Sequence, residues 1–178
     1  PFSNFDLIIS YAKSFLDHEY ANYVIQYIIS KNIPYYNEIL LSLIMENMLK
    51  YSKNKSSSNI IERLLNSCKV QRKDIIEKVS ENKNLLKEII LDEYGQYVFR
   101  CILDHSTEFP AIYDNLIKLT LDSLNELAEY VHGEKFIRKL MENHPRLKKC
   151  LNTDFLISAI FNKNVGEEPG IQNMNLKN

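Results

Sequence analysis

The chain has 178 residues, of which 45% are hydrophobic, so it can bury a core and is not disordered as a whole. Glycine (4) and proline (5) are scarce, which disfavours a β-sandwich or barrel because those folds need many tight turns. The net charge of −1 gives no global basic field that would attract nucleic acid, so any nucleic-acid site must be local.

Hydrophobic residues recur at helical spacing along nearly the whole chain. A break is expected at Asn32-Ile33-Pro34, because the residue before a proline avoids the helical region. The polar residues 53–57 indicate a turn, and the charged residues 69–84 indicate a connecting segment with one short helix near 74–79. In chain order, helices are expected at residues 4–15, 20–30, from the break to about 51, 58–68, 85–91, 94–104, 110–130, 134–143 and 151–161.

The sequence carries no signature of a metal site, a disulfide framework or a catalytic centre. The histidines lack metal-ligand spacing, and there is no glycine-rich phosphate loop or nucleophile motif. Three widely separated cysteines form no Cys-x-x-Cys pair: Cys68, Cys101 and Cys150. We therefore expect no cofactor, no metal and no enzymatic activity.

The sequence shows neither a signal peptide nor a membrane-spanning segment. The beginning of the chain has no basic region followed by an apolar run, and no apolar run approaches the roughly 20 residues of a membrane span. An odd number of cysteines suits a reducing compartment. We expect a cytoplasmic protein that does not associate with membranes.

Three of the expected helices carry the same layout at even intervals. The copies are Ala21–Gln26, Ser57–Glu62 and Gly95–Arg100, and their second residues are 36 and 38 residues apart. A weaker copy, Gly133–Arg138, follows after another 38 residues. Such a period is typical of stacked units, here a long helix followed by a shorter one that carries the motif. We expect an all-α solenoid, superhelical in shape, with the short helices lining one side.

The first copy has the chemistry of a uracil reader. Asn22 and Gln26 are four residues apart, so they project from one helix face. Their amides offer donors and acceptors that suit the pairing edge of uracil. Tyr23 sits beside them, and its ring is a surface on which a base can stack, worth ~1–3 kcal/mol per base.

The second copy keeps the spacing and changes the chemistry. Ser58 and Glu62 replace the two amides, and an ionised carboxylate is an acceptor only. The carboxylate matches the adjacent donors of guanine's pairing edge and repels the carbonyls of uracil. Asn59 takes the stacking position with a flat amide.

The third copy has Gln96, Tyr97 and Arg100. Its tyrosine can stack as in the first copy, whereas the guanidinium of Arg100 is a donor only and can bond to a base carbonyl. Further cations on or near this face could touch phosphates: Arg63, Lys135 and Arg138.

These motifs resemble the PUF (Pumilio) family of single-stranded RNA-binding proteins. Residues 18–26 look like a uracil-type repeat, 58–63 like the family's guanine-reading repeat, and 92–98 like another uracil-type repeat. The weaker copy, 133–140, is similar to the family's C-terminal capping half-repeat. The order matches the last repeats of a PUF domain, about the sixth to eighth plus the cap, and the resemblance covers residues from about 4 to 145.

The resemblance implies a partial Pumilio repeat domain over residues 1–161. From residue 162 on, Asn, Gly, Glu and Lys dominate, so a disordered tail is expected over 162–178. Because family domains have about eight repeats, we expect a fragment with an uncapped apolar N-terminal end, which favours self-association. The implied parts are repeats at about 4–32, 33–68 and 83–105, a connecting insert at 69–82 and a cap at 108–161.

The resemblance also implies one base read by each repeat, with the RNA antiparallel to the protein. The expected core is 5′-UGU-3′, with the third copy on the first uracil, the second on the guanine and the first on the last uracil. Family members usually bind 3′ untranslated regions of messenger RNAs and repress translation or promote decay by recruiting deadenylases, so repressor proteins on the outer face are expected partners.

Two departures from the family pattern carry expectations of their own. Gln96 and Arg100 stand where a uracil-reading repeat usually has Asn and Gln, so the third copy is the one whose base is least defined. Ser56 and Ser57 stand where the family usually has an aromatic residue and an alanine, which should loosen the start of that helix.

Two other functions fit the same helical pattern. One is a protein-interaction scaffold of the HEAT or armadillo kind, which binds proteins on its concave face. The other is a divergent nucleolar PUF-like protein that binds structured ribosomal precursor RNA with little sequence preference. A titration with RNAs that differ in one base distinguishes all three.

Overall fold

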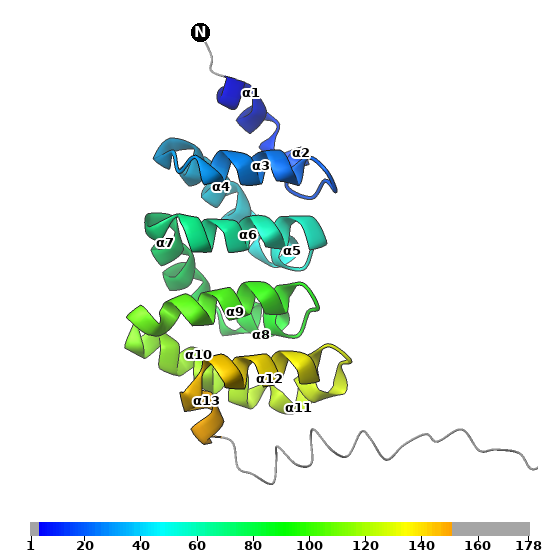
Figure 1. Cartoon of the computed structure of the whole chain (residues 1–178), viewed down its shortest axis with the longest axis vertical. Coiled ribbons are helices and arrows are strands. Elements are labelled where there is room, and N and C mark those ends of the chain that lie inside the picture. Colours follow the sequence, from blue (N-terminus) through cyan, green and yellow to red (C-terminus); the bar gives the residue numbers. More distant parts are fainter. Residues whose placement is uncertain (1–3, 151–178) are drawn as a thin grey trace, which may run out of the picture.

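The computed structural model describes residues 4–150, and all regular structure within them is helical. The helices are stacked in rows along the long axis of the molecule, in the order of the sequence (Figure 1). α3 packs against α6, α6 against α9, and α9 against α12, so one helix of each row forms a continuous side of the stack. The expected all-α solenoid is confirmed.

Each complete row consists of three helices, and the motif lies on the middle one. The long-short pair expected from the sequence is therefore incomplete, because each motif helix lies between a shorter helix that precedes it and a further helix that follows it. The first row is α2 (Ala12–Phe15), α3 (Asn22–Ser30) and α4 (Pro34–Glu46), preceded by α1 (Asn4–Ser10). The second row is α5 (Met48–Ser52), α6 (Lys55–Ser67) and α7 (Lys69–Ser80).

The third and fourth rows repeat this plan. The third row is α8 (Lys83–Ile90), α9 (Gly95–His105) and α10 (Pro110–Asp122), with the 3-10 turn η1 (Ser106–Glu108) between the last two helices. The fourth row is α11 (Leu124–Glu129), α12 (Gly133–Asn143) and α13 (Pro145–Cys150). The helix expected at 151–161 and the tail expected at 162–178 lie outside the described residues.

The connecting insert expected at residues 69–82 is instead the helix α7. Its buried apolar residues are Ile75, Ile76 and Val79, and it packs against α4, α6 and α8. Three buried apolar positions among 12 residues make a narrow stripe, and most of the remaining residues are polar or charged. The helical period is therefore weak in the sequence although the helix contributes to the core.

Two long helices expected from the sequence are each broken into two. The backbone of Asn47 leaves the helical region, with φ −145° and ψ 50°, and separates α4 from α5. Ser123 separates α10 from α11, although its own φ of −96° and ψ of −1° stay near the helical region. The break lets the short second piece turn and pack beside the next motif helix, as α5 does with α6 and α11 with α12.

The short helix and the motif helix approach each other closely at the first motif residue. At Gly95 and Gly133 an added Cβ would collide with the carbonyl group of the residue six positions earlier, Ile89 or Leu127. In the second row, Ser57 occupies this place and donates a hydrogen bond from Oγ to the carbonyl oxygen of Tyr51, again six positions earlier, at 2.9 Å. Ser57 is fully buried, so it anchors the start of α6, and the expected loosening is wrong.

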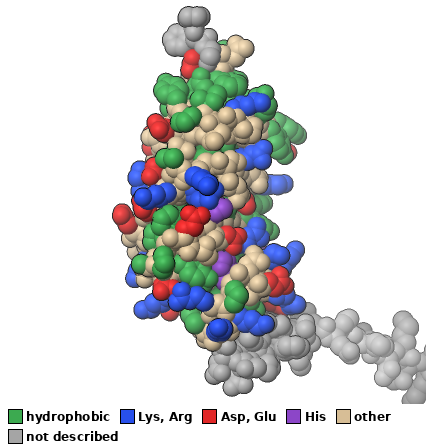
Figure 2. Space-filling model, turned by 60° about the vertical axis from the view of Figure 1, so that its left-hand side comes forward, with side chains coloured by type: hydrophobic (Ala, Val, Ile, Leu, Met, Phe, Trp, Pro, Cys, Tyr) green, Lys and Arg blue, Asp and Glu red, His purple; other side chains and the backbone are tan. Residues whose placement is uncertain are grey.

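Charged side chains are dispersed over the stack. Figure 2 shows basic and acidic side chains intermingled on the side that it presents, with hydrophobic side chains between them. Ion pairs link neighbouring elements, such as Lys50 with Asp17 at 2.5 Å and Lys87 with Glu126 at 2.5 Å. This view agrees with the net charge of −1, since no uniform basic face is visible on that side.

Candidate nucleic-acid interface

The three motif copies lie on adjacent helices of one side of the stack, α3, α6 and α9. We call Asn22, Ser58 and Gln96 the first readers, and Gln26, Glu62 and Arg100 the second readers. The stacking residues are Tyr23, Asn59 and Tyr97. The structure therefore brings all nine predicted site residues to one series of neighbouring helices.

These nine residues differ systematically in exposure. The first readers are nearly buried, with 3% of Asn22, 4% of Ser58 and 4% of Gln96 exposed. The stacking residues project into solvent: 66% of Tyr23 and 42% of Tyr97 are exposed, and Asn59 is exposed as well. The second readers are half-buried. A base stacked on a tyrosine would thus face the second readers directly and meet the first readers at the floor of the site.

The start of each motif helix is fixed by a side chain that precedes the motif. His18 Nδ1 accepts from the backbone N–H groups of Tyr20 and Ala21, at 3.1 and 3.2 Å. Asn54 Oδ1 does the same for residues 56 and 57, at 2.8 and 3.1 Å, and Asp92 Oδ1 for residues 94 and 95, both at 2.9 Å. Each acceptor satisfies N–H groups that have no partner within the helix, so all three copies begin in the same register.

Hydrogen bonds in the first copy hold its two amides together. Asn22 Nδ2 donates to the carbonyl oxygens of His18 and Glu19, at 2.9 and 2.7 Å. Asn22 Oδ1 accepts from Gln26 Nε2 at 2.9 Å. The side chains are therefore held in fixed positions, and a base must replace the bond between them to engage both.

In the second copy a carboxylate replaces this amide pair. Burial raises the pKa of Glu62, and the guanidinium of Arg100 on the neighbouring helix α9 opposes that rise. Ser58 Oγ donates to the carbonyl oxygen of Lys55 at 3.3 Å, and Asn59 Nδ2 donates to the same oxygen at 2.7 Å. The second and third copies are thus coupled electrostatically through Glu62 and Arg100.

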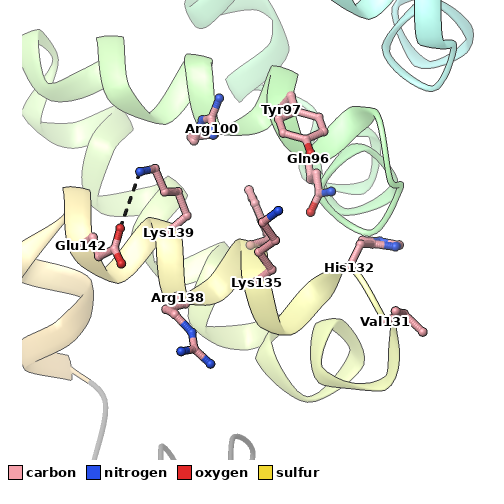
Figure 3. Close-up of a pocket in the computed structure, with 10 residues that line it drawn as sticks. Gln96, Tyr97, Arg100, Val131, His132, Lys135, Arg138, Lys139 and Glu142 are labelled. Carbon is pink, nitrogen blue, oxygen red and sulfur yellow. Dashed lines mark ion pairs between the residues drawn. The ribbon is translucent and has the colours of Figure 1, made fainter.

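The third copy opens onto a groove of about 480 Å³ between α9 and α12. Figure 3 shows Tyr97 and Arg100 of α9 across from Lys135 and Lys139 of α12, with the amide of Gln96 turned toward the gap. The guanidinium carbon of Arg100 lies 5.4 Å from the ring centre of Tyr97. Lys135 occupies the stacking place of the weaker copy, so two consecutive motif helices wall the groove.

The cations predicted to touch phosphates are in different situations. Arg63 on α6 and Lys135 on α12 are exposed. Arg138 Nη2 lies 2.8 Å from Glu134 Oε1, and its guanidinium points away from Arg100 (Figure 3). Lys139 lies 3.6 Å from Glu142 within the groove lining. Arg138 and Lys139 are therefore each close to a carboxylate, whereas Arg63 and Lys135 lie on different motif helices.

Comparison with known proteins agrees with this arrangement. The Pumilio-family RNA binding repeat matches residues 18–45, 47–80 and 86–109. The chain belongs to the PUF (Pumilio) family. The match over 47–80 runs from α5 to the end of α7, so in this PUF chain the three-helix row is the repeat.

Individual relatives support the same assignment. The Pumilio domain-containing protein C6G9.14 of Schizosaccharomyces pombe is 26% identical over 144 residues, which cover 80% of this chain and 21% of that protein. A Puf4 mutant bound to the Cox17 RNA 3′ UTR recognition sequence is similar in structure, with a TM-score of 0.66 and 25% identity over 74% of this chain and 46% of that one. PUF-8 in complex with PBE-RNA shares the fold, with a TM-score of 0.67 and 20% identity over 78% and 41% of the two chains.

This PUF chain thus spans about a fifth of the length of its Schizosaccharomyces pombe relative and less than half of the two solved chains. Within residues 4–150, no helix is long and apolar enough to cross a membrane. The same residues contain no group of three or more His, Cys, Asp or Glu side chains that could hold a metal ion.

Sequence reasoning missed residues one helical turn beyond the motif. Tyr27 follows Tyr23 by four residues, is exposed, and has Lys31 Nζ 4.4 Å above its ring. Lys139 follows Lys135 by the same interval and lines the groove. The i, i+4 spacing places each of these residues on the same face as its stacking position, and that spacing was the available signal.

Proposed function

We propose that this PUF chain binds single-stranded RNA in a sequence-specific way and reads one base with each of three motif copies. The observation that supports this most directly is the repeated layout on α3, α6 and α9, in which an exposed flat side chain stands beside half-buried hydrogen-bonding groups. The Puf4 mutant and PUF-8, which share its fold, are both bound to RNA in their solved structures.

The base assignments follow from the hydrogen-bonding groups. Glu62 of the second copy accepts from two adjacent donors of guanine. The amides of Asn22 and Gln26 provide both donors and acceptors and suit the alternating edge of uracil. With the RNA antiparallel to the chain, the third copy receives the 5′ base, and the sequence-based expectation for the whole core is 5′-UGU-3′.

A code swap tests the middle assignment. In the double variant Ser58→Asn with Glu62→Gln, the second copy acquires the amide pair of the first copy, so preference at the middle base should change from guanine to uracil. Binding of RNAs that differ only at this base is measured by fluorescence anisotropy. A double variant that still prefers guanine contradicts the assignment, and an unmodified chain that binds no RNA at any salt concentration supports the protein scaffold.

We further propose a role for this binding in post-transcriptional regulation of messenger RNA in the cytoplasm, through 3′ untranslated regions and with repressor proteins such as deadenylases on the outer face. Support comes from the Puf4 mutant, whose bound RNA is a 3′ UTR recognition sequence. Crosslinking of the tagged protein in cells, followed by sequencing of the bound RNA, tests the proposal. Enrichment of ribosomal precursor RNA would instead support the nucleolar function.

Self-association through the N-terminal end is proposed as well. A groove of about 570 Å³ lies there between α1 and α4, and its lining includes the exposed side chains of Leu7 and Tyr35. A second copy of the chain could cover this apolar surface. Sedimentation at increasing concentration should show dimers that Leu7→Asp abolishes, and a wild-type chain that stays monomeric refutes the proposal.

A further inference from the structure

The side chains that line the groove between α9 and α12 bring more hydrogen-bond donors than acceptors, and the carboxylate of Glu142 lies 3.6 Å from Lys139. Arg100, Lys135 and Lys139 bring charged donors to it, since guanidinium and ammonium groups cannot accept. Gln96 Nε2 already donates to the carbonyl oxygen of Glu93 at 2.9 Å. Gln96 Oε1 is buried and has no hydrogen-bond partner among residues 4–150. The site thus combines the guanidinium donors of Arg100 with the unpaired acceptor Gln96 Oε1.

A guanidinium fork matches two acceptors that are next to each other. On the pairing edge of cytosine, N3 and O2 are adjacent acceptors and the N4 amino group is a donor. On the edge of uracil, the N3–H donor separates the two carbonyls, so an approaching fork meets a donor between its two acceptors. Arg100 therefore fits cytosine with two bonds and uracil with one.

Gln96 discriminates in the same direction. The N4 amino group of cytosine can donate to Gln96 Oε1 and satisfy an oxygen that is otherwise unpaired. Uracil presents O4 at this place, and two acceptors repel each other. Gln96 lines the groove, but its Oε1 is buried, so the amide has to rotate toward α12 to meet a base that enters there.

We infer that the third copy selects cytosine at the 5′ position, with Arg100 and Gln96 as the specificity-determining residues, so that the preferred core is 5′-CGU-3′ rather than 5′-UGU-3′. This inference rests on the proposed function. The first copy is an internal reference: it has the same stacking tyrosine, but its readers are the mutually bonded amides of Asn22 and Gln26. The stacking residue is thus the same in the two copies, whereas the reading groups differ.

The test uses the whole 178-residue chain and four RNAs that are identical except for the first base of the core, titrated by fluorescence anisotropy. The CGU RNA should bind about tenfold more tightly than the UGU RNA, as for one good bidentate contact. A UGU RNA that binds as tightly as CGU, or a GGU RNA that binds best, overturns the inference. A fifth RNA, CUU, replaces the middle guanine with uracil and measures guanine preference independently.

The outcomes of this titration distinguish a failure of the cytosine assignment from a failure of the proposed RNA binding. If the middle guanine is preferred over uracil and all four first bases bind equally, RNA reading stands and the cytosine assignment fails. If no RNA binds, the proposed function fails, and the cytosine assignment fails with it. Weak complexes are followed by NMR chemical shifts, so low affinity is not mistaken for absence of binding.

Variants at Arg100 sharpen the result. Arg100→Gln should reverse the preference to uracil, because a glutamine offers both an acceptor for N3–H and a donor for O2. Arg100→Lys keeps the charge but lacks the fork, so it should lose the discrimination while retaining most of the affinity. Arg146→Gln on α13, where Arg146 pairs with Asp114 at 2.6 Å, removes an equal charge as the matched control. Unchanged cytosine preference in Arg100→Gln would contradict the assignment.

Discussion

The first and third motif copies share a helix position, a capped start and a stacking tyrosine, but they use their hydrogen-bonding groups differently. In the first copy Gln26 donates to Asn22, and the two amides satisfy each other in the free protein. In the third copy Arg100 lies against Tyr97, and Gln96 keeps a buried oxygen that has no hydrogen-bond partner within residues 4–150. The two copies thus place a base in the same way but offer it different hydrogen-bonding groups. The helix and the stacking ring determine where a base lies, and the readers determine which base is preferred.

Removing the stacking rings tests the shared part of this comparison and should have the largest effect. Tyr23→Ala and Tyr97→Ala should each weaken RNA binding by about 1–3 kcal/mol, because each ring supports one base. Affinity is measured by fluorescence anisotropy on a single core RNA.

Tyr11→Ala serves as the control, since Tyr11 is exposed between α1 and α2 and belongs neither to a motif copy nor to a groove lining described above. A loss in Tyr23→Ala but none in Tyr97→Ala would mean that the third copy does not hold a base, and the comparison between the two copies would fail.

The close approach of the short helices separates the first copy from the later ones in another way. Gly133→Ala places a Cβ against the carbonyl group of Leu127, and overpacking of this kind typically costs about 1–3 kcal/mol, reduced somewhat by the better helix propensity of alanine. The free energy of unfolding is measured by urea denaturation.

The first copy already carries alanine here, so Ala21→Gly should change stability by less than Gly133→Ala does. If Gly133→Ala is as stable as the unmodified protein, the short helix α11 can move to accommodate the added methyl group. Close packing at this position would then not define the start of the motif helix.

How much of this arrangement could be predicted depended on whether a feature is local. The motif helices, their order and the exposure of Tyr23 and Tyr97 follow from spacing within a few residues. Only the part of α7 near 74–79 was predicted as helix, because its apolar stripe of Ile75, Ile76 and Val79 is narrow and becomes evident only against the helices that cover it.

The burial of the first readers was also beyond the sequence. Ser58 and Gln96 each follow directly on the small residue at which a motif helix meets the short helix before it, and that contact is tertiary. Asn22 follows Ala21 at the same place in the motif. Asn54 and Asp92 have side chains that helix starts favour, so the sequence contained an indication of these caps. The sequence did not define where each helix begins, so the cap residues could not be assigned from it.

The titratable reader of the second copy provides a contrast in pH dependence. Because burial raises the pKa of Glu62, its carboxylate is lost at a higher pH than that of an ordinary glutamate as the solution is acidified. Preference for guanine at the middle base should therefore decline on acidification before ordinary glutamates titrate, whereas uracil preference at the last base, read by Asn22 and Gln26, should not change. RNA titrations across the acidic range measure both preferences in one protein.

The effect of Glu62 ionisation on folding stability is opposite to that of a carboxylate stabilised by an ion pair. A folded pKa above the unfolded value means that folding disfavours the ionised form, so Glu62 lowers stability at neutral pH, and this penalty vanishes below the unfolded pKa. Glu62→Gln should thus be slightly more stable than the unmodified protein at neutral pH and equal to it in acid. Arg100→Gln removes the opposing charge and should move the loss of guanine preference to higher pH.

Phosphate contacts should give the smallest effect and one that is blind to sequence. Lys135→Gln at the C-terminal groove should reduce the slope of log Kd against log salt by about 0.7, the value for one contact to a single strand, and weaken all RNAs equally. Arg146→Gln, on α13 and paired with Asp114, should leave the slope unchanged. Lys135 also stands at the stacking place of the weaker copy, opposite Tyr97. A change in first-base preference in Lys135→Gln would therefore show that Lys135 helps to select the base as well as contacting a phosphate. The residues that read the first base would then include one from the neighbouring repeat.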